Sequence, residues 1–154
     1  MTTSMRVIEH SERQDASLQA RGPVLFVVDD DAATLELMCE IAEDAGWAAF
    51  GFTRLAEVSR ALDERRPTVL ILDDDLPDGR GGDLARAMRE DPRMRDVTLL
   101  VCTAAHPMRQ AEIGAWAPVV SKPFDLGEIE GFLAAAGSTS GRGSGRSDEF
   151  ERAG

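Results

Sequence analysis

The stretch TVLILDDDLPDGRGGDL, from Thr68 to Leu84, places a run of apolar residues directly before three consecutive aspartates and a glycine-rich loop. An apolar run of this kind, bounded by turn residues, is typical of a strand that is buried on both faces. Carboxylates that crowd together at the end of such a strand repel one another unless a cation compensates them. The stretch therefore predicts a buried strand that ends at a rim where a cation binds.

Apolar runs alternate with helical periods along the chain, and this alternation sets the fold class. The apolar runs predict five strands, at residues 23–28, 47–52, 68–72, 97–102 and 118–121. The spacing of apolar residues predicts a helix after each strand, at residues 35–45, 55–62, 83–89, 108–113 and 125–136. Thr53 is expected to cap the second helix. The pattern predicts an α/β protein with a doubly wound, five-stranded parallel sheet and helices on both faces.

Aspartates follow two strands of this predicted sheet. In doubly wound folds the site lies outside the carboxyl ends of the strands, where the strand order reverses. Asp29, Asp30 and Asp31 close strand one, and Asp73, Asp74 and Asp75 close strand three. If the order is 2-1-3-4-5, these two strands are neighbours and their carboxylates converge. A ligand set made only of oxygens suits a hard cation such as Mg²⁺. A carboxylate beside Mg²⁺ can accept a phosphoryl group, because the metal offsets charge on the transferring oxygens.

Two further polar side chains stand at the same edge of the predicted sheet. Thr103 follows the fourth strand and Lys122 follows the fifth. The chain has 17 basic residues, and Lys122 is its only lysine. A compact ammonium on a flexible stem is well suited to meet a phosphoryl oxygen. Together with the carboxylates, these residues predict an aspartyl phosphate site.

Four motifs in this order, VVDDD, LILDDDLPDGRGG, CTA and SKPF, resemble the receiver domain of two-component response regulators, in the single-domain form seen in chemotaxis regulators. The resemblance covers residues 23–136 and implies the flavodoxin-like order 2-1-3-4-5. It implies that Asp73, four residues before Pro77, is the phosphoacceptor, with Thr103 and Lys122 contacting phosphoryl oxygens. It also implies a Mg²⁺ site made by Asp29, Asp30, Asp73 and the backbone carbonyl of Asp75.

The resemblance also assigns the neighbours of these residues. Asp74 has no role in the family and is expected to be a solvated loop charge, while Asp31 is expected to be the N-cap of the first helix. The Lys122-Pro123 bond resembles the cis peptide of the family. Val119 occupies the position where the family usually carries an aromatic switch residue. The segment before Lys122 is shorter than usual, so helix four is expected to be shortened or irregular.

The function implied by the resemblance is that of a single-domain response regulator rather than an enzyme. A histidine kinase or a histidine phosphotransfer protein would phosphorylate Asp73, and output would pass through contacts with a downstream protein. The alternative is a receiver-like interaction module that works without phosphorylation. A phosphatase of the haloacid dehalogenase type, with Asp73 as nucleophile and Asp75 as general acid, ranks lower because it leaves the pair Asp29 and Asp30 unexplained.

Composition limits the remaining classes of function. The formal net charge is −11, and the charges of residues 1–22 and 138–154 balance, so the excess lies in residues 23–137. An acidic body without a basic stripe argues against nucleic acid as a partner. No apolar run is long enough for a membrane span, so we expect a cytoplasmic protein with no membrane partner. A homodimer is left open.

Domain organisation follows from the same composition. Residues 23–137 are expected to form one receiver domain. Residues 1–22 are expected to form a polar N-terminal extension, and residues 138–154 are expected to form a flexible tail of Gly, Ser and Arg. Cys39 and Cys102 fall in apolar segments and are expected to be core residues rather than a metal or redox pair.

Overall fold

The computed structural model describes residues 22–138. The expected N-terminal extension and the Gly/Ser/Arg tail therefore lie outside the described residues, except for Gly22 and Ser138 at their edges. Within this described part, none of the helices is both long enough and apolar enough to cross a lipid bilayer.

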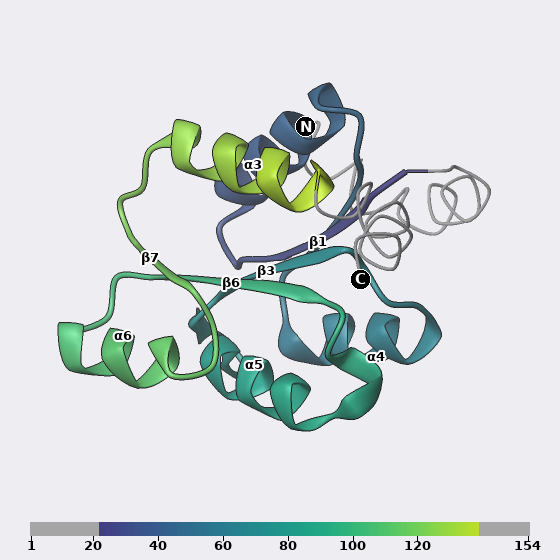
Figure 1. Cartoon of the computed structure of the whole chain (residues 1–154). Helices are drawn as coiled ribbons and strands as arrows, with labels where there is room; N and C mark the ends of the chain where they lie inside the picture. Colours follow the sequence, from purple (N-terminus) through teal and green to yellow (C-terminus); the bar gives the residue numbers. More distant parts are fainter. Residues whose placement is uncertain (1–21, 139–154) are drawn as a thin grey trace, which may run out of the picture.

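Five parallel strands form the central sheet, in the order β2-β1-β3-β6-β7 (Figure 1). In chain order this is 2-1-3-4-5, which confirms the prediction. The strands are β1 (Val24–Val28), β2 (Ala48–Phe52), β3 (Val69–Asp73), β6 (Thr98–Thr103) and β7 (Val119–Ser121). The strand order reverses between β1 and β3, so the carboxyl ends of these two neighbouring strands border the crevice where such folds bind ligands.

Helices cover both faces of the sheet, as predicted. The helices are α3 (Ala32–Asp44), α4 (Leu55–Glu64), α5 (Gly81–Glu90), α6 (Pro107–Gly114) and a last helix over residues 126–138. Figure 1 shows α3 and the last helix on one side of the sheet and α4, α5 and α6 on the other. Three short elements complete the described chain: β4 (Asp75–Leu76), β5 (Gly79–Arg80) and the 3₁₀ turn η1 (Pro92–Met94).

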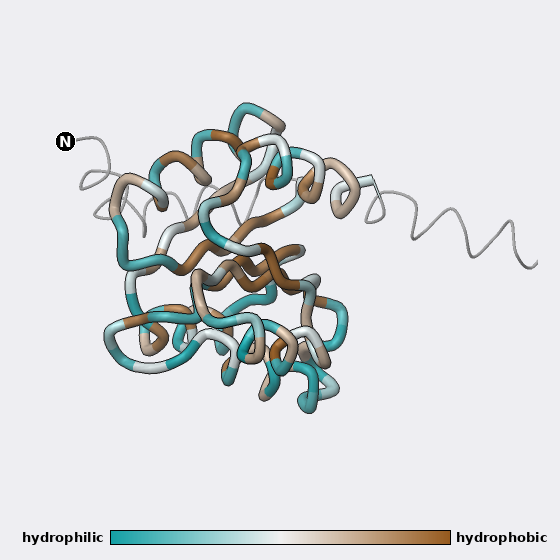
Figure 2. Tube along the Cα trace, turned by 90° about the vertical axis from the view of Figure 1, so that its left-hand side faces the viewer, coloured by the Kyte–Doolittle hydropathy of each residue, from teal (hydrophilic) through white to brown (hydrophobic). Residues whose placement is uncertain are grey.

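The core divides into two layers because alternate residues of each strand point to opposite faces. In β1, Leu25 and Val27 belong to the cluster that packs under α3 and the last helix. Phe26 belongs to the other cluster, under α4 and α5, where its ring meets the ring of Phe50 edge to face at 5.9 Å between centroids. Figure 2 shows the most hydrophobic segments running through the middle of the molecule, between the two helical layers. Burial of apolar surface on both sides of the sheet is the main force that holds this fold together.

The ends of α3 follow the sequence signals. Asp31 is the N-cap, and its carboxylate accepts a hydrogen bond from the backbone N–H of Thr34, as predicted. After α3 the chain turns at Gly46, whose φ of 92° is a left-handed conformation that glycine adopts without a steric penalty. The chain then enters β2 and returns alongside β1.

The prediction that Thr53 caps α4 was wrong. Thr53 instead donates from its own N–H and hydroxyl to the carboxylate of Glu57. The first N–H groups of α4 are capped from a distant loop, because Asp78 accepts hydrogen bonds of 2.8 and 2.9 Å from the N–H groups of Leu55 and Ala56. The loop that follows β3 is thereby fastened to the start of α4.

Helices α5 and α6 differ in how well the sequence placed them. Helix α6 has only eight residues, which confirms the expected short fourth helix. Helix α5 begins at Gly81, two residues before the predicted start.

His106 is the N-cap of α6, with its Nδ1 accepting a hydrogen bond from the N–H of Met108.

Candidate functional site

Three aspartates converge at the carboxyl ends of β1 and β3. The two strands pair in parallel register up to Val28 and Leu72, so the residues that follow them emerge side by side. One carboxylate oxygen from each of Asp29, Asp30 and Asp73 lies within 4.8 Å of the others. Asp29 and Asp73 are buried, with 2% and 6% of their surface exposed, whereas Asp30 is exposed. The structure therefore brings together the three carboxylates that the sequence predicted to converge.

Lys122 supplies a positive charge to this cluster. Its Nζ lies 3.0 Å from Oδ2 of Asp29 and 3.3 Å from Oδ2 of Asp73. The lysine follows β7, where its N–H donates to the carbonyl of Thr103 at 2.8 Å, and the Lys122-Pro123 bond is cis as expected. Burial acts to lower the pKa of Lys122, but the two carboxylates outweigh burial and the net pKa is raised. The ammonium is therefore charged at neutral pH.

The proton affinity of Asp73 differs from that of an ordinary aspartate. Burial raises its pKa above the usual value, while the N–H of Asp75 and the ammonium of Lys122 act in the opposite direction. The charge of Asp29 adds to the upward shift. A cation that entered the cluster would offset the negative charges of Asp29 and Asp73.

The carboxylate cluster fits Mg²⁺ in its chemistry and its size. Octahedral Mg²⁺ with oxygen ligands at about 2.1 Å has adjacent ligands about 3 Å apart, a spacing that side-chain movements from the observed separations within 4.8 Å would provide. Asp29, Asp30 and Asp73 would hold the ion, and water would complete its coordination. Asp75 is exposed, and its carboxylate does not belong to this cluster. The contribution of its backbone carbonyl to the metal site stays a prediction.

Thr103 completes the polar lining at the end of β6. Its side chain is buried, and its hydroxyl oxygen accepts a 3.0 Å hydrogen bond from the N–H of Ala105. The hydroxyl proton can therefore be donated into the adjoining pocket. This pocket, of about 380 Å³, is lined by Asp30, Asp73, Asp74, Asp75, Arg80, Thr103, Ala104, Ala105 and Lys122.

The structure corrects the expectation that Asp74 is a solvated loop charge. Its relative exposure is 0%, and both carboxylate oxygens are hydrogen-bonded. Arg109 of α6 donates to Asp74 through Nε at 3.1 Å and Nη2 at 3.0 Å, and Gly82 donates through its backbone N–H at 3.0 Å. Burial acts to raise the pKa of Asp74, but these hydrogen bonds outweigh burial and the net pKa is lowered. Asp74 is therefore a buried carboxylate that stays charged.

Comparison with known proteins agrees with this geometry. The family model described as the response regulator receiver domain matches residues 25–134. The chain belongs to the response regulator receiver domain family. Its cluster of carboxylates, Thr103 and Lys122 lies at the same strand ends that the motifs of the receiver domain predicted from the sequence.

Similar proteins include a regulator that is longer than this chain. The phosphate regulon transcriptional regulatory protein PhoB of Pseudomonas aeruginosa is 27% identical over 126 residues, which cover 79% of this chain and 55% of PhoB. The chain thus spans about half the length of that relative.

Solved structures with the same fold include two receiver-type proteins. A putative response regulator from Chloroflexus aurantiacus is 24% identical, with a TM-score of 0.69 over 77% of this chain and 99% of the other. The receiver domain of the sensor histidine kinase PA1611 from Pseudomonas aeruginosa is 19% identical, with a TM-score of 0.64 over 73% of this chain and 94% of the other. That second structure has a magnesium ion coordinated in its active site cleft.

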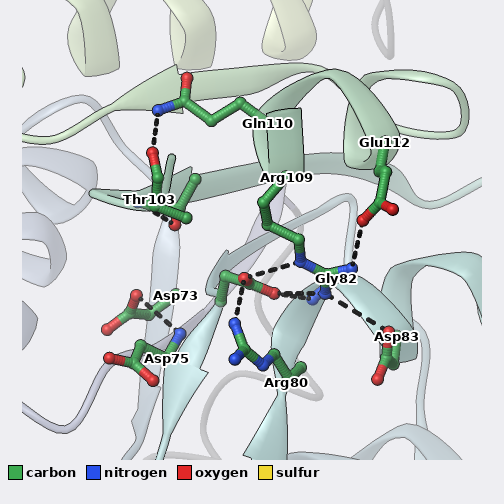
Figure 3. A network of polar contacts seen from close by, with 11 residues as sticks. Asp73, Asp75, Arg80, Gly82, Asp83, Thr103, Arg109, Gln110 and Glu112 are labelled. Carbon is green, nitrogen blue, oxygen red and sulfur yellow. Dashed lines mark hydrogen bonds and ion pairs between the residues drawn. The ribbon is translucent and has the colours of Figure 1, made fainter. Parts of the chain in front are cut away.

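Two arginines of the receiver domain were not predicted near the site. Arg80, the last residue of β5, lines the pocket and lies 3.4 Å from the Asp74 carboxylate, and Arg109 reaches Asp74 from α6 (Figure 3). Neither has a distinctive local signal, because each stands in a polar segment and its partner is distant in the sequence. Trp116, just after α6, is half-buried, and its indole N–H donates to the carbonyl of Gly82 at 2.9 Å.

Proposed function

We propose that Asp73 accepts a phosphoryl group from the phosphohistidine of a histidine kinase or a histidine phosphotransfer protein. The observation that carries this proposal is the position of the Asp73 carboxylate, which shares Lys122 with Asp29 and faces the polar pocket that Thr103 also lines. One oxygen of Asp73 would attack phosphorus as the bond to the imidazole nitrogen breaks. The product is an aspartyl phosphate, and the released imidazole nitrogen takes up a proton.

The residues around Asp73 support this transfer electrostatically. Mg²⁺, when bound by the three aspartates, would offset negative charge on the phosphoryl oxygens. The Lys122 ammonium can turn from Asp73 to a phosphoryl oxygen, because the separation of 3.3 Å is the longer of its two contacts. The Thr103 hydroxyl can donate to another phosphoryl oxygen. Each of these groups stabilises charge that grows during the transfer.

The proposal covers the biological role as well as the chemistry. The protein would be a response regulator of a two-component system in the cytoplasm, with output through contacts with a downstream protein. It would act as a phosphoacceptor that assists its own phosphorylation and dephosphorylation, without turning over an external substrate. Membership of the receiver domain family supports the role as a response regulator of a two-component system. Single-domain status and the downstream partner remain proposals.

Intact-mass spectrometry tests the chemistry. The protein is incubated with Mg²⁺ and acetyl phosphate, in parallel with Asp73→Asn and with the control Asp91→Asn, whose carboxylate pairs with Arg93 at the far end of α5. We expect one phosphoryl adduct that requires Mg²⁺, that is absent in Asp73→Asn and that is retained in Asp91→Asn. An Asp73→Asn protein that is phosphorylated like the wild type would contradict the proposal.

If no adduct forms with acetyl phosphate, the same comparison is repeated with a phosphohistidine donor. Absence of an adduct with both donors, while Mg²⁺ binding is measured separately, would instead favour the interaction module that works without phosphorylation.

A further inference from the structure

Asp74 makes a second charged centre directly beside the phosphoacceptor. Its carboxylate receives two hydrogen bonds from Arg109, one from the N–H of Gly82, and a longer contact of 3.4 Å from Arg80. The two bonds from Arg109, through Nε and Nη2, form the bidentate arrangement that fixes geometry as well as charge. Figure 3 shows Arg80, Arg109 and Gly82 converging between Asp73 and α6.

This centre joins three parts of the fold that are distant in sequence. Asp74 follows β3, Gly82 is in the first turn of α5, and Arg109 lies 35 residues away in α6. The packing at Gly82 is close, because an added Cβ atom would lie 2.9 Å from the Asp74 carboxylate and 3.0 Å from the Arg109 guanidinium. The carbonyl of the same glycine accepts the indole N–H of Trp116, just after α6. One end of α6 is thus linked to Asp74, next to the phosphoacceptor, and the segment after its other end is linked to the first turn of α5.

The two arginines differ in how firmly they are held. The Arg109 side chain is 21% exposed and also contacts Asp83 and Glu112, so its guanidinium cannot move far without α6. The Arg80 side chain is 56% exposed and lines the pocket of Asp73. A phosphoryl group on Asp73 would add negative charge to this pocket, attract Arg80 and repel the Asp74 carboxylate. The added charge would thereby act on the ion pair between Asp74 and Arg109, which holds α6.

We propose that the Asp74–Arg109 pair couples phosphorylation of Asp73 to the position of α6. This inference rests on the proposed phosphorylation of Asp73, and it identifies Asp74 and Arg109 as positioning residues that do not touch the reacting atoms. Because coupling is reciprocal, a partner that binds α6 changes the affinity of Asp73 for a phosphoryl group by the same factor. Asp74 and Arg109 are then the side chains through which phosphorylation of Asp73 affects α6.

Trp116 provides a natural reporter of the segment that follows α6. Its fluorescence is recorded before and after addition of Mg²⁺ with beryllofluoride, which mimics the phosphoryl group, and Mg²⁺ with acetyl phosphate is tested in parallel. The mass of the acetyl phosphate samples is measured at the same time. The change is assigned to Trp116 if it persists in Trp47→Phe and disappears in Trp116→Phe. A change that disappears in Trp47→Phe instead would overturn the proposal.

The decisive comparison uses Asp74→Asn and Arg109→Gln, with Arg93→Gln as the matched control. Arg93 also pairs with an aspartate, Asp91, but the Arg93 side chain is 79% exposed and the pair lies at the far end of α5. We expect all three variants to form the adduct, while the response of Trp116 falls at least about fivefold in the first two and stays at the wild-type level in Arg93→Gln. Arg109→Lys keeps the charge without the bidentate geometry and should give an intermediate response.

The outcomes separate the two proposals. An adduct in every protein together with a full response of Trp116 in Asp74→Asn and Arg109→Gln would overturn the coupling alone. The absence of an adduct in the wild type with both acetyl phosphate and a phosphohistidine donor would overturn the proposed phosphorylation and the coupling with it. Circular dichroism of each variant identifies one that fails to fold, and Arg109→Lys, which retains the ion pair, then decides the question.

Discussion

Lys122 donates a hydrogen bond of 3.0 Å from Nζ to the carboxylate of Asp29, which lies 93 residues earlier in the chain. The same ammonium contacts Asp73 at 3.3 Å. One lysine thus compensates two buried carboxylates at the point where a cation would bind. Lys122 and Mg²⁺ therefore act on the same negative charges, and removal of one should alter the effect of the other.

We predict that Lys122→Gln destabilises the metal-free protein and strengthens Mg²⁺ binding. Two buried carboxylates would lose their positive partner, at a cost of about 2–4 kcal/mol. Mg²⁺ would then meet a more negative site, with an affinity raised at least about tenfold. Thermal unfolding in EDTA and in Mg²⁺ checks both effects. The melting temperature in EDTA should fall, and the increase caused by Mg²⁺ should exceed that of the wild type. An equal or smaller increase would contradict this account of the site.

Gly81 should be intolerant of any side chain. A Cβ atom at this position would lie 2.1 Å from the carbonyl oxygen of Asp73, a backbone atom that cannot rotate away. We predict that Gly81→Ala costs about 3 kcal/mol or more in the free energy of unfolding. Gly114→Ala is the control, because nothing lies within 4 Å of an added Cβ there and α6 should gain about 0.4–1 kcal/mol. Urea denaturation of both variants tests the prediction; similar stabilities would count against it.

The strands and their order could be predicted because a parallel sheet buried on both faces gives a strong local signal. Each strand is an apolar run in the sequence. The aspartates, Thr103 and Lys122 stand at the same end of strands that are neighbours in the sheet, β1, β3, β6 and β7. The start of α5 was harder to predict. Glycine disfavours a helix in its own right, so Gly81 and Gly82 were interpreted as loop residues. Their place in the helix depends on the close approach of Asp73 and Asp74, which local sequence does not reveal.

The burial of Asp74 could not be predicted for a related reason. Three consecutive aspartates look alike in sequence, and the one without a family role was expected to face solvent. Its partner Arg109 lies 35 residues away, and the pair exists only because α6 packs beside the start of α5. Asp78, which caps α4 from a distant loop, was missed in the same way. The sequence around a carboxylate that binds a distant partner has no periodic pattern that would identify it.

The thiol of Cys102 should be unreactive in the folded protein. Burial raises its pKa to about 12, and the nearby ammonium of Lys122 offsets this only in part. Alkylation requires the thiolate, whose fraction at pH 8 is then about 10⁻⁴, against about 0.2 for an ordinary cysteine. We predict that iodoacetamide at pH 8 leaves Cys102 unlabelled in the native protein and labels it rapidly in denaturant. The rate should rise with pH between 8 and 10. Rapid native labelling would contradict the buried position of β6.

The central claim is that Asp73, among three consecutive aspartates, accepts the phosphoryl group. The most direct test is chemical trapping: the protein is phosphorylated with acetyl phosphate and Mg²⁺, reduced with borohydride, digested, and mapped by peptide mass spectrometry. Reduction converts a phosphorylated aspartate to homoserine and leaves free carboxylates unchanged. The account predicts homoserine at position 73 alone. Homoserine at Asp74 or Asp75, with Asp73 unchanged, would contradict it.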